Sequence, residues 1–530
     1  MVPRTALIEL GKLIAGTMAG GPLPDGLGNL GDVLAATPET VLDLIDLAVA
    51  ESRRKRGDAA VVEAFGLMAG QALEVLRFRV ESHHDAAIAA VAAARARLKS
   101  LAEDGKLDPS VLSLLLQQFV RAKLDLGEEL QAVSMALAER AASRASADPL
   151  DIGGALAEMA RQCDGDVFAL QAELAERTAA FPETHRAGIV AALLGADVTA
   201  LREAAIGWLL DAGPATRNDT AGLLQQAAAG GGLSATMLRR LVMMRNWLPE
   251  GERPRLDTIV RTAREKGETI APLPPAAPRQ VLASTIDGSG AQSLFVTVKD
   301  GRKQAAAAVL IKFGIGVRDA WVRAGLSKAE VEAFRFQIDS QVQCFDSGIG
   351  HVRLALGQAL ALAEASGVLP PFGLVDVVER TGLGAVAPEP VPVEALVARL
   401  LSDIPAARRA PDAVDRVLRE SAAWDQAFPF VDSWFEHDGA VDALLRAKRL
   451  SAKRQTALVL EQYLPARRRW WAELVAWTSF TLAQDKATGD AWMALALVAQ
   501  ALLDERPLGE IPLMSIIAGQ TVAAWRAEQG

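Results

Sequence analysis

The sequence is poor in the residues that build disulfide scaffolds, clustered metal sites and aromatic-rich β-folds. Its 530 residues include two cysteines, one tyrosine and five histidines, and aromatic residues make up 5% of the chain. Cys163 and Cys344 lie far apart in the sequence, which excludes a multi-disulfide framework and a metal site made of several cysteines. The shortage of aromatic residues also argues against an immunoglobulin-like sandwich.

Charge of one sign does not dominate the chain either. Lysine and arginine total 56 against 65 aspartates and glutamates, which gives a net charge of −9. Hydrophobic residues make up 51% and charged residues 23%, a composition typical of folded globular proteins. An acidic net charge disfavours nucleic acid as a partner. The length predicts about three or four domains, or one elongated repeat array.

Long hydrophobic runs are scarce as well. Glu9 and Lys12 interrupt the apolar N-terminus, which argues against a secretory signal. Residues 491–503 form a strongly apolar stretch near the C-terminus, but it is shorter than the ~20 residues that a helix needs to cross a membrane. We therefore expect a buried helix at 491–503, no transmembrane segment, and a cytoplasmic protein.

The N-terminal half of the chain has a helical pattern. Alanine, leucine, glutamate and arginine dominate it, and no extended alternating run appears before residue 278. Two proline-rich passages, 268–278 and 382–393, cannot continue a helix and divide the chain into three parts.

A repeat is visible between residues 181 and 267. Pro182, Pro214 and Pro249 each precede a new helical segment, at spacings of 32 and 35 residues. Second breaks at Gly195 and Gly230 are also 35 residues apart and separate two short amphipathic helices. These helix pairs resemble HEAT-like repeats, and the resemblance implies an α-solenoid in which each pair buries its apolar face against the next. A generic helical bundle is the alternative.

The middle of the chain predicts β-structure. Asp287-Gly288 and Asp300-Gly301 lie between runs rich in β-branched residues, the strongest hairpin signal in the sequence. We expect a three-stranded antiparallel meander, followed by a helix that begins near Val317. The three strands are placed at 280–286, 291–298 and 303–313. In the second strand, Leu294, Val296 and Val298 share one face, and the residues between them share the other.

These patterns together predict a mostly α-helical protein, with an α-solenoid-like array of helical repeats and a small three-stranded β-meander in the middle. Four regions follow: an N-terminal helical region (1–145), HEAT-like helix pairs (146–267), a β-meander with helices (279–381) and a C-terminal helical region (394–530).

One candidate catalytic cluster lies in the middle region. Glycines flank Asp287, Ser289, Arg318 and Asp319, and glycines let a ligand approach the backbone closely. Free amides at a helix start near Val317 would attract an anion, which Arg318 could also bind. No complete dinucleotide or phosphate-loop motif is present, so ordinary turns and a helix cap remain the alternative.

A second, weaker combination is Cys344 with His351, seven residues apart, the minimum for a thiol activated by an imidazole. No orienting third group is visible in the sequence. No motif indicates a cofactor or a bound metal ion, and we expect neither.

A basic stretch in the C-terminal region is a candidate binding surface. Its residues attract phosphates, and tryptophan can stack on bases or lie at a membrane interface. The candidates are Arg446, Arg449, Arg454, Arg467, Arg468 and Trp470. A solvated helix face is the alternative.

The sequence therefore favours a non-enzymatic interaction scaffold or adaptor that binds another protein through an extended helical surface. An enzyme with a polar site where the meander meets the helices is the first alternative. Binding of a phosphate backbone or anionic surface through residues 446–469 is the second.

Overall fold

The structure is a computed structural model and describes residues 3–18, 40–144, 152–446 and 450–529. The chain forms two compact units. The first comprises Met1–Ala196 and Asp438–Ala443, and the second comprises Asp197–His437 and Leu444–Gly530. The four regions predicted from the sequence stay a prediction.

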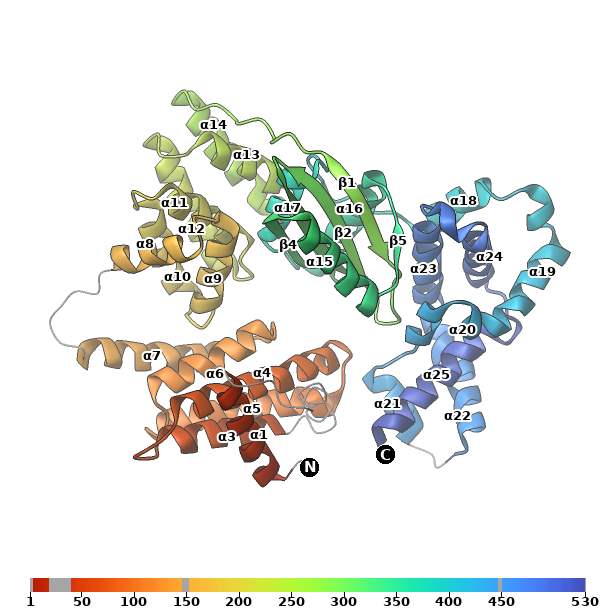
Figure 1. The fold of residues 1–530 in the computed structure, drawn as a ribbon, viewed down its shortest axis with the longest axis horizontal. Helices are drawn as coiled ribbons and strands as arrows, with labels where there is room; N and C mark the ends of the chain where they lie inside the picture. The colour runs from red at the N-terminus through yellow and green to blue at the C-terminus, as the bar shows by residue number, and fades with distance from the viewer. Residues whose placement is uncertain (1–2, 19–39, 145–151, 447–449, 530) are drawn as a thin grey trace. The chain divides into compact units, whose positions relative to one another are not determined.

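The first unit is helical and is built around one long central helix. That helix, α4 (Ala59–Glu81), packs against α1, α3, α5 and α6, drawn in red and orange in Figure 1. Its core positions Phe65, Met68 and Leu76 are almost fully buried. The other helices of this unit are α1 (Arg4–Met18), α3 (Thr40–Ser52), α5 (Asp85–Glu103), α6 (Pro109–Arg121), α7 (Glu128–Arg144), α8 (Ile152–Gln162), α9 (Val167–Thr178) and α10 (Glu183–Leu194).

Helix α4 is also long and apolar enough to cross a membrane by length and composition, the one such helix among the described residues. Much of its apolar surface is buried in the core of the first unit, as expected of a core helix. It begins at Asp58, whose carboxylate accepts a hydrogen bond from the Ala60 amide at 2.9 Å and so caps the helix.

The second unit begins with short helices, two of which start at the predicted prolines Pro214 and Pro249. Helix α12 packs against the 3₁₀-helix η2 and against α14. The elements are α11 (Thr199–Ala204), η2 (Ala205–Leu210), α12 (Pro214–Ala229), α13 (Ala235–Met244), η3 (Arg245–Trp247), η4 (Glu250–Glu252) and α14 (Arg253–Glu265).

An arginine recurs three or four residues after each of the three repeat prolines and makes the same kind of contact. Arg186 donates to the Phe181 and Ala179 carbonyl oxygens at 3.1 and 2.9 Å. Arg217 donates to the Asp211 and Ala212 oxygens, both at 2.9 Å. Arg253 donates to the Leu248 oxygen at 2.9 Å. Each guanidinium thus satisfies carbonyl groups left free just before the turn.

The middle of the chain forms a five-stranded antiparallel sheet, so the prediction of three strands was wrong. The strand order is β4-β3-β2-β1-β5. The Asp300-Gly301 hairpin is confirmed, because Asp300 pairs directly with Lys303. The strands are β1 (Pro278–Ser284), β2 (Ala291–Asp300), β3 (Lys303–Lys312), β4 (Gly316–Leu326) and β5 (Cys344–Asp346).

The helix expected near Val317 is strand β4, which is a second correction. Gly314 and Gly316 adopt positive φ angles of 80° and 124° and turn the chain back along β3. The segment that follows, from Val317 to Leu326, then pairs with β3. The alanines 305–308 are poor strand formers, yet they lie in β3 because a strand pairs with it on either side, and they are nearly fully buried.

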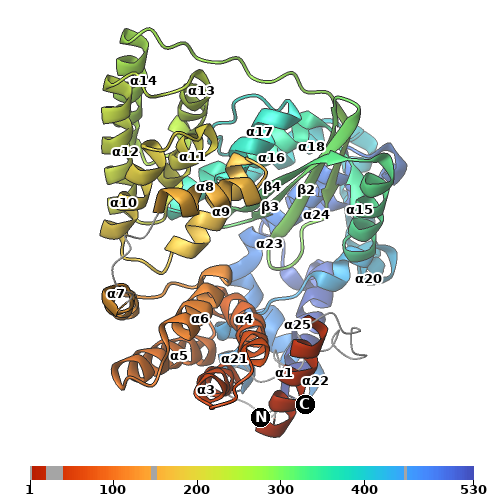
Figure 2. The ribbon, with the colours of Figure 1, turned by 60° about the vertical axis from the view of Figure 1, so that its left-hand side comes forward.

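Helices cover both faces of the sheet. The structure confirms the two faces predicted for β2: Leu294, Val296 and Val298 are buried, whereas the alternate residues are half-buried. Phe334 of α15 (Lys328–Gln341) lies edge-on to Phe295 at 6.1 Å, on the half-buried face. Figure 2 shows α15 and α16 (Ile349–Ser366) on opposite sides of the strands. Helix α17 (Gly373–Thr381) also packs against the sheet.

The C-terminal part is helical, and the mostly α-helical fold class is confirmed. The predicted buried helix at 491–503 is α24 (Ala491–Leu503), which packs against α23 (Leu464–Leu482) and α18 (Val393–Ser402). The remaining helices of four residues or more are η5 (Ala406–Arg409), α19 (Pro411–Glu420), α20 (Trp424–Ala427), η7 (Pro429–Ser433), α21 (Gly439–Arg446), α22 (Ala452–Leu458), the π-helix η8 (Val459–Tyr463) and α25 (Pro512–Gln529).

Arg217→Ala is expected to lower the free energy of unfolding by about 2 kcal/mol or more, since it leaves two carbonyls and the Glu252 carboxylate without their donor. Arg255→Ala, an exposed arginine on the neighbouring helix, is the matched control and should change stability by less than about 0.5 kcal/mol. Urea denaturation of the full chain measures both. Equal effects would show that the turn does not depend on its arginine.

Candidate functional site

The residues of the predicted catalytic cluster hold turns and strands together. The Asp287 Oδ1 atom accepts hydrogen bonds from the Ser289 hydroxyl at 2.7 Å and from the Ala291 amide at 2.9 Å. The Gly288 amide donates to the Ser433 carbonyl at 3.0 Å. Asp287 and Ser289 therefore stabilise the loop between β1 and β2.

Arg318 and Asp319 lie on strand β4, not at a helix start. The register between β3 and β4 shifts here, where Leu310 pairs with Asp319 and Ile311 pairs with Val317, so Arg318 is the extra residue of a β-bulge. Asp319 is exposed, and its Oδ1 atom accepts a hydrogen bond from the Ala320 amide at 3.0 Å. Without a helix, the free amide groups expected near Val317 are not available to an anion.

The basic stretch is in part committed to internal contacts. The Arg467 Nε atom donates to the buried Glu436 carboxylate at 2.8 Å, and the Arg468 Nη1 atom donates to the Arg506 carbonyl at 2.8 Å. Arg469 forms an ion pair with Glu394. Arg446 and Arg454 are exposed, and Arg449 lies outside the described residues.

Trp470 joins the basic stretch to the predicted glycine loops. The Arg467 guanidinium stacks on its ring at 4.7 Å. A Cβ atom added at Gly290 would lie 2.7 Å from the ring, and one at Gly314 would lie 3.7 Å away. The structure thus brings Trp470 against the Asp287 loop, but as a packing contact between the sheet and α23.

Cys344 and His351 do not form a dyad. The His351 Nδ1 atom lies 2.6 Å from the Ser347 hydroxyl, and its ring packs edge-on against Phe480 at 5.1 Å. Burial raises the pKa of the Cys344 thiol to about 12, so a thiolate nucleophile does not form near neutral pH. In the described part of the chain, no three His, Cys, Asp or Glu side chains gather as a metal site would require.

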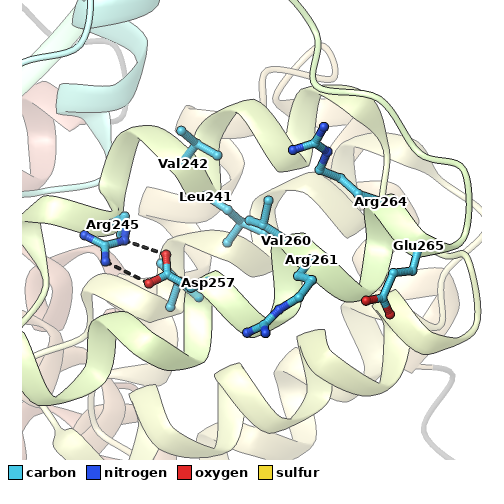
Figure 3. Close-up of a pocket in the computed structure, with 9 residues that line it drawn as sticks. Leu241, Val242, Arg245, Asp257, Val260, Arg261, Arg264 and Glu265 are labelled. Carbon is cyan, nitrogen blue, oxygen red and sulfur yellow. Dashed lines mark hydrogen bonds and ion pairs between the residues drawn. The ribbon is translucent and has the colours of Figure 1, made fainter.

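An open groove on the second unit, between α13 and α14, is the best candidate for a functional site. Its volume is about 530 Å³, and the residues that line it lie on α13, on α14 and between the two helices (Figure 3). Leu241 and Leu256 form its buried floor, and Val242 is 46% exposed beside it. The lining residues are Leu241, Val242, Arg245, Leu256, Asp257, Val260, Arg261, Arg264 and Glu265.

Charged side chains surround this apolar floor. Arg245 and Asp257 form a two-pronged ion pair, with Nε–Oδ1 and Nη2–Oδ2 distances of 2.5 and 2.7 Å (Figure 3). The hydrogen bond from Arg245 lowers the pKa of Asp257, so the pair stays charged at neutral pH. Arg261 and Arg264 are exposed and form no ion pair with any described residue. The groove therefore has an apolar floor and a cationic rim.

Buried ion pairs fix α13 beneath the groove. The Arg240 guanidinium donates to Glu379 of α17 at 3.2 Å and to Glu203 of α11 at 3.0 Å. Arg239 donates to the same Glu379 carboxylate at 2.8 Å. Arg240 and Val242 are two residues apart on a helix and point about 200° apart, so anchoring the first turns the second outward.

The sequence analysis missed this groove. The signal was present in α14, where Arg261 and Arg264 stand three residues apart and therefore share a helix face with Val260 close by. That pattern is indistinguishable from an ordinary solvated face, because the sequence alone does not show that Val242 of another helix lies beside it.

Gly290→Ala is expected to destabilise the protein by about 2 kcal/mol more than Gly301→Ala. Both glycines have positive φ angles, 82° and 57°, so both variants carry similar backbone strain. Only at Gly290 would the added methyl group collide with Trp470, whereas nothing lies within 4 Å at Gly301. Urea denaturation of both variants measures the difference. Equal losses would mean that Trp470 is not packed on this loop.

His351 is expected to make stability fall with acid. Burial lowers the pKa of His351 in the folded protein to about 4, below its ordinary value of 6.5. As the pH falls, His351 is therefore protonated in the unfolded chain before it is protonated in the folded protein. The stability that the neutral ring contributes is fully present above pH 6.5 and is lost progressively towards pH 4. Over this range the free energy of unfolding falls by up to about 3 kcal/mol. In urea denaturation from pH 8 to pH 4, the free energy of unfolding of His351→Gln should depend less on pH than that of the wild type. The difference between the two proteins at pH 8 measures how much the substitution itself destabilises the fold. If the free energy of unfolding of the variant depended on pH as steeply as that of the wild type, His351 would not be the group responsible.

Two family models match separate parts of the chain. The model described as the Y4lR second domain matches residues 182–267, which contain the groove, and the model described as the Y4lR C-terminal helical domain matches residues 394–526. The chain is 29% identical over 381 residues to the uncharacterized protein y4lR of Sinorhizobium fredii (strain NBRC 101917 / NGR234), across 71% of this chain and 72% of that protein. No solved structure matches the chain significantly. The groove thus lies in a segment that is similar to the Y4lR second domain.

Proposed function

We propose that the protein is a non-enzymatic interaction scaffold or adaptor that binds another protein through its helical surface. The observation that carries the proposal is the groove between α13 and α14. Its floor is apolar, Val242 is exposed beside it, and its position is fixed by buried ion pairs. Such a preformed apolar groove suits helix-in-groove recognition, because little conformational freedom is lost on binding.

The polar groups that suggested an enzyme have structural roles. Asp287 and Ser289 hold a turn, and the raised pKa of Cys344 leaves it protonated. The arginines 467–469, which suggested a phosphate-backbone site, contact a buried carboxylate, a carbonyl and Glu394. These contacts favour the interaction scaffold over both alternatives.

The proposal includes a HEAT-like, solenoid-type arrangement of the helix pairs between residues 181 and 267. Its support is the 32- and 35-residue spacing of the prolines and the recurrent arginine at positions 186, 217 and 253. Stacked pairs expose helix faces that neighbouring elements do not cover, and partners of such proteins bind there. We also propose a cytoplasmic location.

A photo-cross-linking amino acid in place of Val242 is expected to yield an adduct with one defined protein in cells that express the full chain. The same amino acid at Leu310, an exposed apolar position on β3, is the matched control and should not yield that adduct. Val242→Asp, without a cross-linker, should leave stability within about 0.5 kcal/mol, because the side chain is exposed, yet abolish co-purification of the protein identified by the adduct.

Cross-linking from both positions alike would show that the groove is not selective. Loss of every adduct, together with turnover of a small molecule by the purified chain, would overturn the scaffold proposal.

A further inference from the structure

We propose that the α13–α14 groove binds an acidic amphipathic helix of the partner protein. The inference rests on the proposed function and adds the chemistry of the bound segment. It follows from three properties of the groove: its length, its apolar floor and the sign of its unpaired charges.

The length of the groove suits a short helix. Its lining residues on α14 run from Leu256 to Glu265, which corresponds to about 14 Å along the helix axis at a rise of 1.5 Å per residue. A second helix alongside would contact it over roughly ten residues, or almost three turns. Figure 3 shows the lining side chains spread along α14 and the adjoining end of α13, as a helix-sized site requires.

The apolar part of the groove can hold a narrow hydrophobic stripe. Val242 is 46% exposed and Val260 is half-buried, while Leu241 and Leu256 close the floor beneath them. Partner side chains at positions i, i+3, i+4 and i+7 of a helix form a stripe of this kind. Burying Val242 would remove an exposed apolar side chain from water, which favours association.

The unpaired charges of the rim select an acidic partner. Arg245 is neutralised by Asp257, whereas Arg261 and Arg264 form no ion pair with a described residue. Lys266, which follows α14, is exposed and adds a third positive charge nearby. The lining holds two carboxylates, Glu265 and the Asp257 that pairs with Arg245, so three arginines face two acidic groups. Carboxylates that flank the partner's hydrophobic stripe would therefore meet arginine forks, which bind carboxylates with two hydrogen bonds.

The same rim is a poorer match for nucleic acid. No aromatic side chain lines the groove for bases to stack on, and the Asp257 and Glu265 carboxylates lie within it. The chain as a whole carries a net charge of −9, which repels a polyanion at longer range. A short acidic helix needs only the local arginines and the apolar floor.

The test uses the full chain and a fluorescent peptide of about 14 residues, with leucine at i, i+3, i+4 and i+7 and glutamate on both flanks of the stripe. Fluorescence anisotropy should show saturable binding to the wild-type chain. The double variant Arg261→Glu and Arg264→Glu should raise the dissociation constant at least about tenfold, which corresponds to about 1.4 kcal/mol. Binding should also weaken as salt increases.

Matched controls separate local charge from net charge. The double variant Arg302→Glu and Arg419→Glu changes the net charge equally at exposed arginines outside the groove, and it should bind the peptide as the wild type does. Peptides with lysine or glutamine in place of glutamate should bind at least about tenfold more weakly. Thermal melting of each variant checks that it is folded.

Equal binding of the glutamine peptide, or no effect of the Arg261/Arg264 variant, would overturn the acidic-helix inference but leave the scaffold proposal intact. Binding of a single-stranded oligonucleotide that depends on Arg261 and Arg264, without peptide binding, would overturn the inference in favour of nucleic acid. If no peptide binds, the inference fails; if Val242 also yields no adduct and the purified chain turns over a small molecule, the proposed function fails with it.

Discussion

The buried carboxylate of Glu379 connects the helical repeats of the second unit to its sheet. It accepts hydrogen bonds from Arg239 and Arg240 of α13, and Arg240 also reaches Glu203 of α11. Burying a charge is costly unless it is paired, and here two arginines balance two glutamates. Removing any one of the four would leave an uncompensated charge in the interior, so the position of α13 against α17 is strongly specified.

The groove is a consequence of that anchoring. With Arg240 turned inward, Val242 faces outward, and α14 packs beside α13 without covering it. A side chain as apolar as valine is ordinarily placed on the buried side of a helix. Its exposure beside an apolar floor and two arginines that form no ion pair with a described residue distinguishes this surface from the rest of the helix pair.

The residues that looked catalytic in the sequence show how a polar cluster can serve the fold. Glycine and aspartate at 287–290 build a turn that the Trp470 ring packs against, and the buried Glu436 carboxylate holds Arg467 in contact with that ring. The Asp287 loop and the basic stretch are the two places where the sequence predicted a site. Their residues nevertheless lie between sheet and helix, where close packing requires glycine and a buried carboxylate requires an arginine.

The sequence by itself determined what depends on local periodicity. The helical pattern before residue 278, the Asp300-Gly301 hairpin, the two faces of β2 and the buried helix at 491–503 all follow from spacing or turn chemistry within a few residues. The tertiary structure decided the rest. Alanines 305–308 became a strand because strands pair with them on both sides, and the segment after Val317 became β4 because β3 was there to pair with it. Residues far away in the chain also decided which arginines are buried and which line the groove. A local sequence pattern does not show which residues pack against it.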